Sequence, residues 1–207
     1  MTGRAALAPL PPVRAPLRRW AFVIVLAVVC VAFGLLGETG RALGRYEREM
    51  LELGEWWRLA TAHLVHLGPA HLAMNLVALA LIGALFDDVL SAGEWTAAAV
   101  ASAAAIDAGL WVFAPPVGWY VGLSGVLHGL FAYGALKLAL RGAPAGWLLA
   151  AGLGAKLAWE HWAGAVPFSA ATAGGPVVVE AHLFGALGGA LALAAGAAVR
   201  GLRGAPL

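Results

Sequence analysis

Apolar runs long enough to cross a bilayer dominate this sequence. A helix of about 20 apolar residues spans the hydrocarbon core, and only 12% of the residues here are charged, against about 25% in soluble domains. The sequence therefore predicts an all-α, polytopic membrane protein with six transmembrane helices. The predicted helices cover residues 20–36, 70–86, 95–113, 123–140, 145–162 and 177–199.

The same pattern predicts one membrane domain with two short tails. Residues 20–200 form the domain, residues 1–19 are a Pro- and Arg-rich tail, and residues 201–207 are the second tail. No clear small-residue cleavage site follows the first apolar run, so we expect a retained helix and not a signal peptide. Cys30 is the single cysteine, which excludes an intrachain disulfide. The basic residues form no nucleic-acid patch.

The distribution of basic residues predicts the orientation of the chain. Cytoplasmic loops carry an excess of Lys and Arg, so we expect both termini in the cytoplasm. That topology places eight of the 13 basic residues on the cytoplasmic side: Arg4, Arg14, Arg18, Arg19, Lys137, Arg141, Arg200 and Arg203. On the other side, residues 37–58 mix charges with two tryptophans, which is typical of a segment at the membrane interface.

A serine between small residues begins the fourth predicted helix. The run is Gly122-Leu123-Ser124-Gly125, and a serine in a first helical turn borders free backbone N–H groups. A nucleophile for acyl transfer needs such access and such donors. Small residues are also common where membrane helices pack, so the motif alone leaves both interpretations open.

Polar residues gather in the predicted outer half of the helices. At about 1.5 Å per helical residue, Ser124 lies roughly 20 Å from the cytoplasmic edge. Such groups are costly in lipid and usually face one another or a water-filled cavity. The others in this half are His71, Asn75, Asp107, Lys156, Glu160, Glu180 and His182.

The sixth predicted helix carries a histidine on a face of glycines. Small faces let helices approach closely, and packing this face against that of the fourth helix would bring His182 within reach of Ser124. Nucleophile and base have this relation in acyl transfer, whereas a histidine merely hydrogen-bonded at the interface is the alternative. The glycines are Gly185 and Gly189 on the sixth helix and Gly122, Gly125 and Gly129 on the fourth.

The second predicted helix offers two neutral hydrogen-bond donors. His71 and Asn75 lie four residues apart on one face, and both suit a developing oxyanion in a site of low dielectric. A hydrogen-bonded pair that packs helices is the alternative. His63, His66 and His71 lack the His-Glu-x-x-His spacing of a metal site, and no acid lies among them. We expect neither a metal nor a cofactor.

Together these motifs resemble the signature of the rhomboid intramembrane serine proteases, over nearly the whole chain. The resemblance implies the six-helix rhomboid fold, with Ser124 as nucleophile and His182 as general base in a dyad that has no aspartate. It also implies an oxyanion hole formed by His71, Asn75 and the backbone N–H of Ser124.

One position departs from the rhomboid pattern. Rhomboids commonly carry a tyrosine four residues after the serine, packed on the catalytic histidine, whereas this chain has His128. We expect His128 to pack and not to act as a base, because a residue on the serine's own helix is poorly aimed at its hydroxyl. Lys156 and Glu160 form either a simple ion pair or a feature specific to a subfamily. Glu180 should point away from the face of the sixth-helix histidine, and Asp107 should tie helices together.

The finer resemblance is to the rhombosortase branch of the family. Residues 122–129, 156–160 and 179–183 are similar to that branch, as is the compact length. Rhombosortases are associated with C-terminal anchors of exported bacterial proteins, in which a Gly-Gly motif precedes one transmembrane helix and a basic tail. The resemblance therefore implies a membrane-anchored protein substrate in the bacterial inner membrane, cut towards the periplasmic side.

Two functions of other kinds, and a broader substrate range, compete with this interpretation. A rhomboid-like chaperone would bind membrane helices without cutting them, although the serine and histidine argue against it. A transporter would have repeated halves with broken helices, and no repeat is visible. A general rhomboid protease would cut other single-span substrates. In a protease, residues 163–176 would act as a lid and the fifth predicted helix as a gate.

Overall fold

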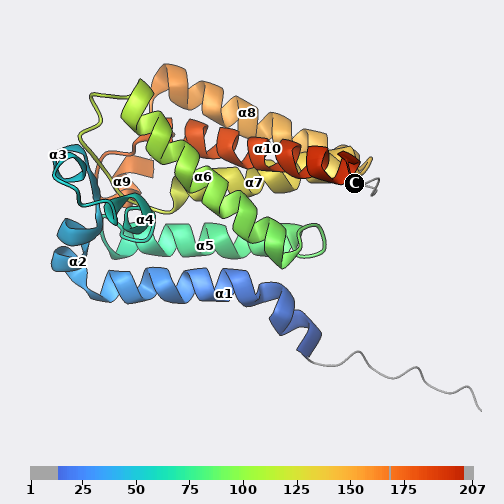
Figure 1. Cartoon of the computed structure of the whole chain (residues 1–207), viewed down its shortest axis with the longest axis horizontal. Coiled ribbons are helices and arrows are strands. Elements are labelled where there is room, and N and C mark those ends of the chain that lie inside the picture. Colours follow the sequence, from blue (N-terminus) through green and yellow to red (C-terminus); the bar gives the residue numbers. More distant parts are fainter. Residues whose placement is uncertain (1–13, 168, 203–207) are drawn as a thin grey trace, which may run out of the picture.

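Long helices packed side by side form the protein (Figure 1). The structure is a computed structural model that describes residues 14–167 and 169–202. Helix α7 lies in the middle of the bundle and contacts α5, α6, α8 and α10, whereas α1 packs outside against α5. The long helices are α1 (Arg14–Leu35), α5 (Pro69–Phe86), α6 (Ala92–Phe113), α7 (Ser124–Leu140), α8 (Pro144–Ala163) and α10 (Val179–Leu202).

Local sequence signals explain where several of these helices begin. Pro69 occupies the first turn of α5, where its missing N–H removes no intrahelical bond. Helix α6 begins with a capping box, in which Ser91 Oγ accepts from the Glu94 N–H and the Glu94 carboxylate accepts from the Ser91 N–H. The helix boundaries therefore lie close to those that the sequence predicts.

Helices α1 and α10 extend into the residues that the sequence assigns to the two tails. Helix α1 begins at Arg14, inside the predicted tail over residues 1–19, and α10 continues to Leu202. Apolar residues define the part of a helix inside the bilayer, but a helix can extend past them in water. Residues 1–13 and 203–207 of the predicted tails lie outside the described residues.

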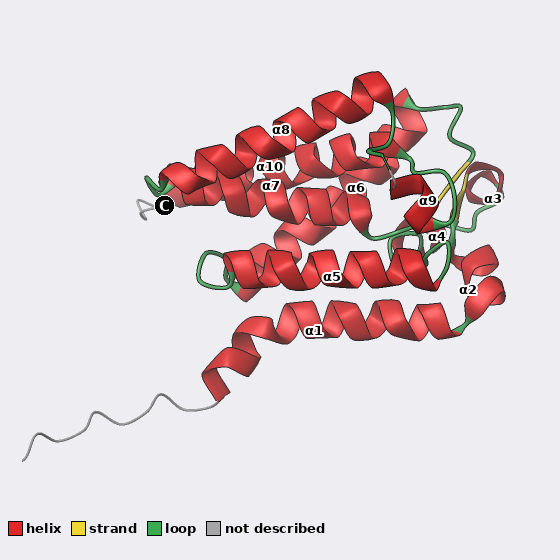
Figure 2. Cartoon of the chain, turned by 180° about the vertical axis from the view of Figure 1, so that it is seen from behind, coloured by secondary structure: helices red, strands yellow, loops and turns green. Residues whose placement is uncertain are grey.

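Short elements gather at one end of the bundle (Figure 2). Tyr46 pairs with Tyr120 in a two-stranded antiparallel sheet, and both side chains are buried. The sequence predicted neither this sheet nor α9 in the predicted loop, because such short elements carry no periodic signal. The short elements are α2 (Gly37–Gly44), β1 (Tyr46–Glu47), α3 (Arg48–Glu52), α4 (Arg58–Thr61), β2 (Trp119–Tyr120) and α9 (Ser169–Ala173).

A buried arginine holds the segment between α1 and α5 together. Arg58 donates to the carbonyl oxygens of Ala42 and Arg45, both at 2.9 Å, and its guanidinium lies 2.6 Å from the Glu55 carboxylate. Buried charges require such pairing. This segment is therefore an ordered layer over the bundle and not a free loop.

Three helices of the described chain, α5, α6 and α10, are long and apolar enough to cross a membrane. Helices α1 and α2 would add a fourth span if they are counted as one, although they are bent by 110°. Helix α7 is apolar but shorter, and α8 carries Lys156 and Glu160. The count of six transmembrane helices stays a prediction.

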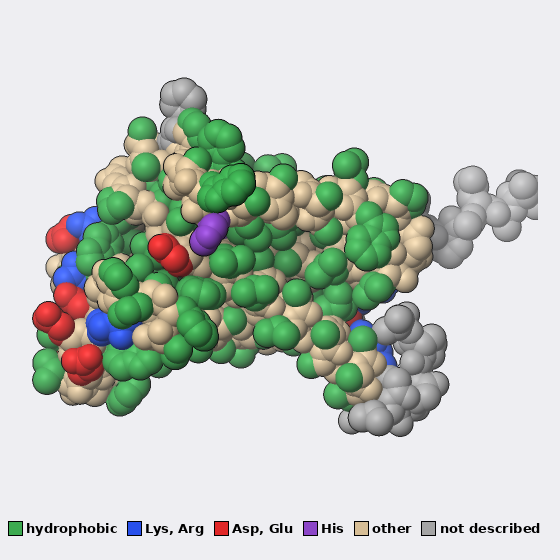
Figure 3. Space-filling view, turned by 90° about the horizontal axis from the view of Figure 1, so that it is seen from above, with side chains coloured by type: hydrophobic (Ala, Val, Ile, Leu, Met, Phe, Trp, Pro, Cys, Tyr) green, Lys and Arg blue, Asp and Glu red, His purple; other side chains and the backbone are tan. Residues whose placement is uncertain are grey.

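The surface of the bundle has the character of a membrane protein (Figure 3). Hydrophobic side chains cover its middle, and charged side chains gather towards the end that carries α2 and α3. Tryptophan is enriched at membrane–water interfaces, which is the position that the sequence predicts for residues 37–58. Exposed tryptophans lie among the short elements and near the last turns of α6 and α8: Trp56, Trp57, Trp119, Trp111, Trp159 and Trp162.

Candidate functional site

Helices α7 and α10 pack backbone to backbone through glycines. A Cβ atom on Gly185 would lie 2.0 Å from the carbonyl oxygen of Gly125, and one on Gly189 would lie 2.0 Å from that of Gly129. Side chains larger than hydrogen would push the helices apart. The packing of two glycine faces that the sequence predicts is present here.

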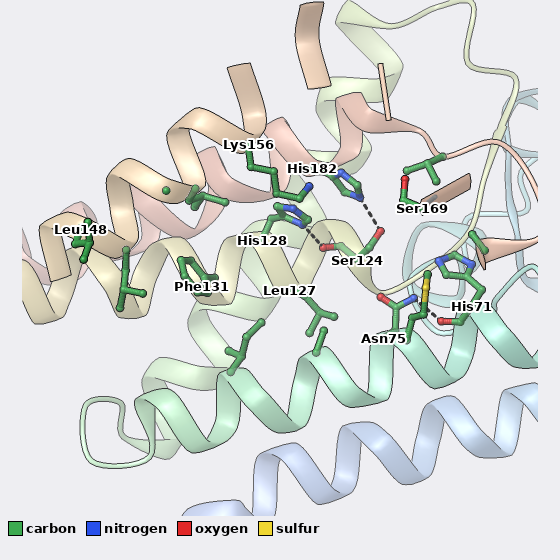
Figure 4. Close-up of a pocket in the computed structure, with 18 residues that line it drawn as sticks. His71, Asn75, Ser124, Leu127, His128, Phe131, Leu148, Lys156, Ser169 and His182 are labelled. Atoms are coloured by element: carbon green, nitrogen blue, oxygen red, sulfur yellow. Dashed lines mark hydrogen bonds between the residues drawn. The ribbon is translucent and has the colours of Figure 1, made fainter. Parts of the chain in front are cut away.

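This packing brings Ser124 and His182 together (Figure 4). Ser124 is the first residue of α7 and His182 lies in the first turn of α10. The distance from Ser124 Oγ to His182 Nε2 is 3.0 Å, and the imidazole is buried. A hydroxyl hydrogen-bonded to an imidazole is the arrangement from which a base can withdraw the hydroxyl proton.

A carboxylate lies behind the histidine. Glu160 Oε2 is 2.9 Å from His182 Nδ1, and Lys156 Nζ donates to Glu160 Oε1 at 2.6 Å. The sequence identified the Lys156–Glu160 pair, but the family resemblance implied a serine–histidine dyad with no aspartate, and Glu160 was given no contact with His182. The contact from α8 to α10 was therefore missed. A carboxylate at the predicted depth of Ser124 in a membrane helix is the signal that points to it.

His128 stacks on His182. The ring centroids are 4.1 Å apart and the planes are inclined by 14°. His128 Nδ1 lies 2.7 Å from the backbone oxygen of Ser124, and it must donate there because a carbonyl only accepts. This side chain therefore lies against the ring of His182 and is bonded to the backbone of α7.

His128, Glu160 and His182 also have the spacing of a metal site. One ligand atom of each lies within 4.8 Å of the others. The Lys156 ammonium already binds Glu160, and a cation at this place disfavours a second one. We therefore treat the group as a hydrogen-bonded cluster.

His63, His66 and His71, weighed above as metal ligands, do not form a group that could hold a metal ion among the described residues. His63 Nε2 faces Asp107 Oδ1 at 3.3 Å, so Asp107 links α6 to the segment before α5. The rings of His66 and His71 meet edge to face at 5.1 Å. Burial, assisted by the nearby His71, lowers the pKa of His66 to about 4, so His66 is neutral at physiological pH.

His71 and Asn75 of α5 line the same cavity as Ser124 (Figure 4). The Leu67 N–H donates to His71 Nδ1 at 3.3 Å, which leaves the proton of the neutral ring on Nε2. Asn75 Nδ2 donates to the carbonyl oxygen of His71 at 3.0 Å. Its second amide hydrogen has no protein partner among the contacts of the described residues. Each side chain can therefore supply one N–H donor to the cavity.

A glycine fixes the turn before α7. Gly122 has a φ of +118°, and a Cβ atom there would lie 2.7 Å from the ring of His71. Its N–H donates to the carbonyl oxygen of Ala62 at 2.8 Å, and its own carbonyl oxygen accepts from the Tyr120 hydroxyl at 2.5 Å. Burial raises the pKa of Tyr120, so its hydroxyl stays a donor. These contacts of the turn position Ser124 beside His71 of α5.

An apolar cavity of about 490 Å³ extends from Ser124 and His182. It lies over α7 between α5 and α8, and α9 contributes to its wall near Ser124 (Figure 4). A cavity with a mostly apolar lining accommodates apolar groups well. The apolar lining residues are Met74, Ala78, Ile82, Leu127, Phe131, Leu148, Leu149, Leu153, Ala173 and Val177.

Comparison with known proteins places these features in a family. A sequence model of the rhomboid domain matches residues 53–198. The chain is similar to rhomboid protease GluP of Bacillus subtilis (strain 168), with 34% identity over 92 residues. This alignment covers 44% of the chain and only 18% of the length of that relative.

Proposed function

Because this chain belongs to the rhomboid family, we propose that it is an intramembrane serine endopeptidase. The observation that supports this most is the 3.0 Å contact between Ser124 Oγ and His182 Nε2. The contact lies at one end of a cavity lined largely by apolar side chains. A similar protein is named as a rhomboid protease, which favours a peptide bond as the target.

Hydrolysis in this site would proceed in two steps through an acyl-enzyme. Ser124 Oγ attacks the peptide carbonyl carbon while His182 Nε2 takes the hydroxyl proton. The C–N bond then breaks as the imidazolium returns this proton to the leaving amine. In the second step His182 takes a proton from water, which attacks the ester. The ester bond breaks as the proton passes to Ser124 Oγ, and a carboxylic acid is released.

The negative charge that develops on the carbonyl oxygen during attack requires hydrogen-bond donors. We assign this role to His71 Nε2–H, the free amide hydrogen of Asn75, and the backbone N–H of Ser124. Neutral donors in a site of low dielectric stabilise a developing oxyanion at no cost in reorganisation. Their position on α5 and at the start of α7 supports the assignment.

The cavity suggests how a substrate helix reaches the serine. We propose that the protein crosses the bacterial inner membrane six times, with both termini cytoplasmic and Ser124 towards the periplasm. A substrate segment would enter between α5 and α8, with α8 as the gate. Residues 163–176, which include α9, would be the lid, since α9 contributes to the cavity wall.

A serine-directed fluorophosphonate tests the enzymatic proposal. We expect purified wild type to be labelled at Ser124, and we expect Ser124→Ala and His182→Ala to lose labelling. His128→Ala should keep it, although at a lower rate. Ser91→Ala, which removes the cap of α6 and a hydrogen bond to the Glu94 carboxylate but no residue that lines the cavity, is the matched serine control and should label as wild type does.

Folded wild-type protein that resists both a large and a small fluorophosphonate would contradict a protease. The family fold would then be explained by a rhomboid-like protein that binds membrane helices without cutting them. Loss of labelling in His128→Ala together with retention in His182→Ala would reverse the roles given to the two histidines.

The finer proposal concerns the substrate. On its resemblance to rhombosortases, we propose that the protein cuts C-terminal anchors in which Gly-Gly precedes a transmembrane helix and a basic tail. The test is co-expression with an exported reporter that carries such an anchor, beside a matched reporter with Leu-Leu in place of Gly-Gly. Cleavage of the first alone supports anchor sorting, and equal cleavage of both indicates a general rhomboid protease.

A further inference from the structure

We propose that Glu160 is a positioning residue that, with Ser124 and His182, completes a catalytic triad. The inference rests on the proposed protease function and concerns how the base is prepared. Three successive contacts carry it: Lys156 Nζ to Glu160 Oε1 at 2.6 Å, Glu160 Oε2 to His182 Nδ1 at 2.9 Å, and His182 Nε2 to Ser124 Oγ at 3.0 Å. Glu160 itself is only 3% exposed.

Hydrogen-bonding capacity decides where the histidine proton lies. An ammonium only donates, so Lys156 bound to Glu160 favours an ionised carboxylate. An ionised carboxylate only accepts, and His182 Nδ1 must therefore carry a hydrogen. In a neutral imidazole Nε2 is then bare, and it accepts from the hydroxyl of Ser124. The chain of contacts thus selects the one tautomer that can act as a base.

The carboxylate also stabilises the charge that forms during reaction. When His182 takes the serine proton, an imidazolium arises 2.9 Å from Glu160. This attraction is stronger in a buried site than in water. Glu160 does not take up the proton; it holds the ring and balances its charge.

His128 does not fill this role. Its ring stacks on that of His182 and its Nδ1 donates to the backbone of Ser124. It therefore packs against the base without reaching the Nδ1 hydrogen. Glu160, which comes from α8, supplies that contact from a third helix.

Fluorophosphonate inactivation kinetics test the proposal. Glu160→Gln keeps the shape of the side chain and its ability to bond Lys156, but an amide can donate to His182 Nδ1 and so favour the wrong tautomer. We expect the maximal inactivation rate to fall about 100-fold or more. The half-saturating probe concentration should stay within about twofold, because probe binding is separate from the chemical step.

Two comparisons make this result specific. Glu180→Gln removes an exposed carboxylate two residues before His182. The fluorophosphonate should inactivate this variant at the same rate as wild type. Glu160→Asp keeps the charge and should recover part of the rate that Glu160→Gln loses. A Glu160→Gln variant that reacts as fast as wild type would overturn the triad, while Ser124-dependent labelling of wild type would leave the protease proposal intact.

A second measurement reads the tautomer of His182 directly in the wild-type protein. Histidine ¹⁵N NMR at neutral pH reports which ring nitrogen carries the hydrogen, and the His182→Ala spectrum assigns the signal. We expect hydrogen on Nδ1 of His182 in wild type. Hydrogen on Nε2 would overturn the inference whatever the kinetics of the variants show. Absence of labelling in folded wild type would instead refute the protease function on which the inference rests.

Discussion

The two sides of α7 are packed in opposite ways. Towards α10 the glycine faces bring backbone against backbone, and the reacting atoms of Ser124 and His182 lie at the end of this contact. Towards α5 and α8 a cavity of about 490 Å³ opens beside Ser124, and α8 packs closely on the α7 backbone only at its beginning, through Gly146. We call these the closed side and the open side.

The difference separates two requirements of an enzyme in a membrane. Nucleophile and base must keep a constant distance, and two backbones in contact leave little freedom to change it. A substrate helix must enter from lipid, which requires a side where side chains can move. Glu160 links the two, because it lies on α8 of the open side and contacts His182 of the closed side.

Opening the closed side should have the largest effect. In Gly185→Ala the new methyl group would lie 2.0 Å from the Gly125 oxygen, so α10 must move away from α7. We expect destabilisation of about 3 kcal/mol, the upper end of common overpacking costs, and loss of fluorophosphonate labelling. Thermal unfolding in detergent and labelling measure the two effects.

An exposed glycine of α8 that does not line the cavity provides the matched control. Gly154 of α8 has nothing within 4 Å of an added Cβ atom, and alanine favours a helix over glycine by about 1 kcal/mol. Gly154→Ala should therefore be as stable as wild type or more so. Equal behaviour of the two variants would contradict the division into closed and open sides.

The sequence predicted the closed side well for a physical reason. Glycines at helical spacing identify one face of a helix from the sequence alone. Two such faces in a membrane protein are expected to pack against each other, because small residues let helices approach closely. The contact between Glu160 and His182 could not be predicted in the same way. Periodicity tells which residues share a face, but the rotation of α8 relative to α10 depends on packing across the whole bundle.

For the end of the bundle with the short elements, the sequence predicted the interfacial composition but not the individual turns and strands. Charges and tryptophans over residues 37–58 indicated an interfacial segment, and the structure has ordered turns there, held by Arg58. The pairing of Tyr46 with Tyr120 joins residues far apart in sequence, and two-residue strands give no alternation to detect. Such contacts depend on the fold that brings them together.

An oxyanion donor on the open side should have the next largest effect. Asn75→Ala removes an amide that lines the cavity beside Ser124. Loss of one such donor typically costs about 10²–10³ in rate, and we expect this loss in kcat with little change in KM for a reporter anchor. A change confined to KM would assign Asn75 to substrate binding, and an unchanged rate would exclude it from the oxyanion hole.

Filling the cavity should have a smaller and selective effect. Gly152 of α8 lines the cavity, and nothing lies within 4 Å of a Cβ atom there. Gly152→Phe should reduce cleavage of a helical substrate about tenfold, a loss typical of a mismatched apolar pocket, while a small fluorophosphonate still labels Ser124. Gly154→Phe, outside the cavity, is the control. Equal loss of cleavage in both variants would show that the cavity does not receive the substrate.

The smallest effect should come from the ordered layer, which the two paired strands join to the segment before α7. Arg45 lies 2.6 Å from Glu47 in β1, and this hydrogen-bonded guanidinium holds the pKa of Glu47 below its ordinary value of 4.5. Because the pKa is lowered in the folded state, the pair stabilises the protein above the unfolded pKa, and this stabilisation is lost as the pH falls through the folded pKa.

Glu47→Gln should therefore lower the free energy of unfolding by about 0–1 kcal/mol at pH 7, and its melting temperature should converge with that of wild type in acid. The exposed Glu52→Gln in α3 serves as the control and should track wild type at both pH values. A loss of labelling in Glu47→Gln comparable to that of Gly185→Ala would mean that the ordered layer, and not the glycine contact alone, holds Ser124 and His182 in place.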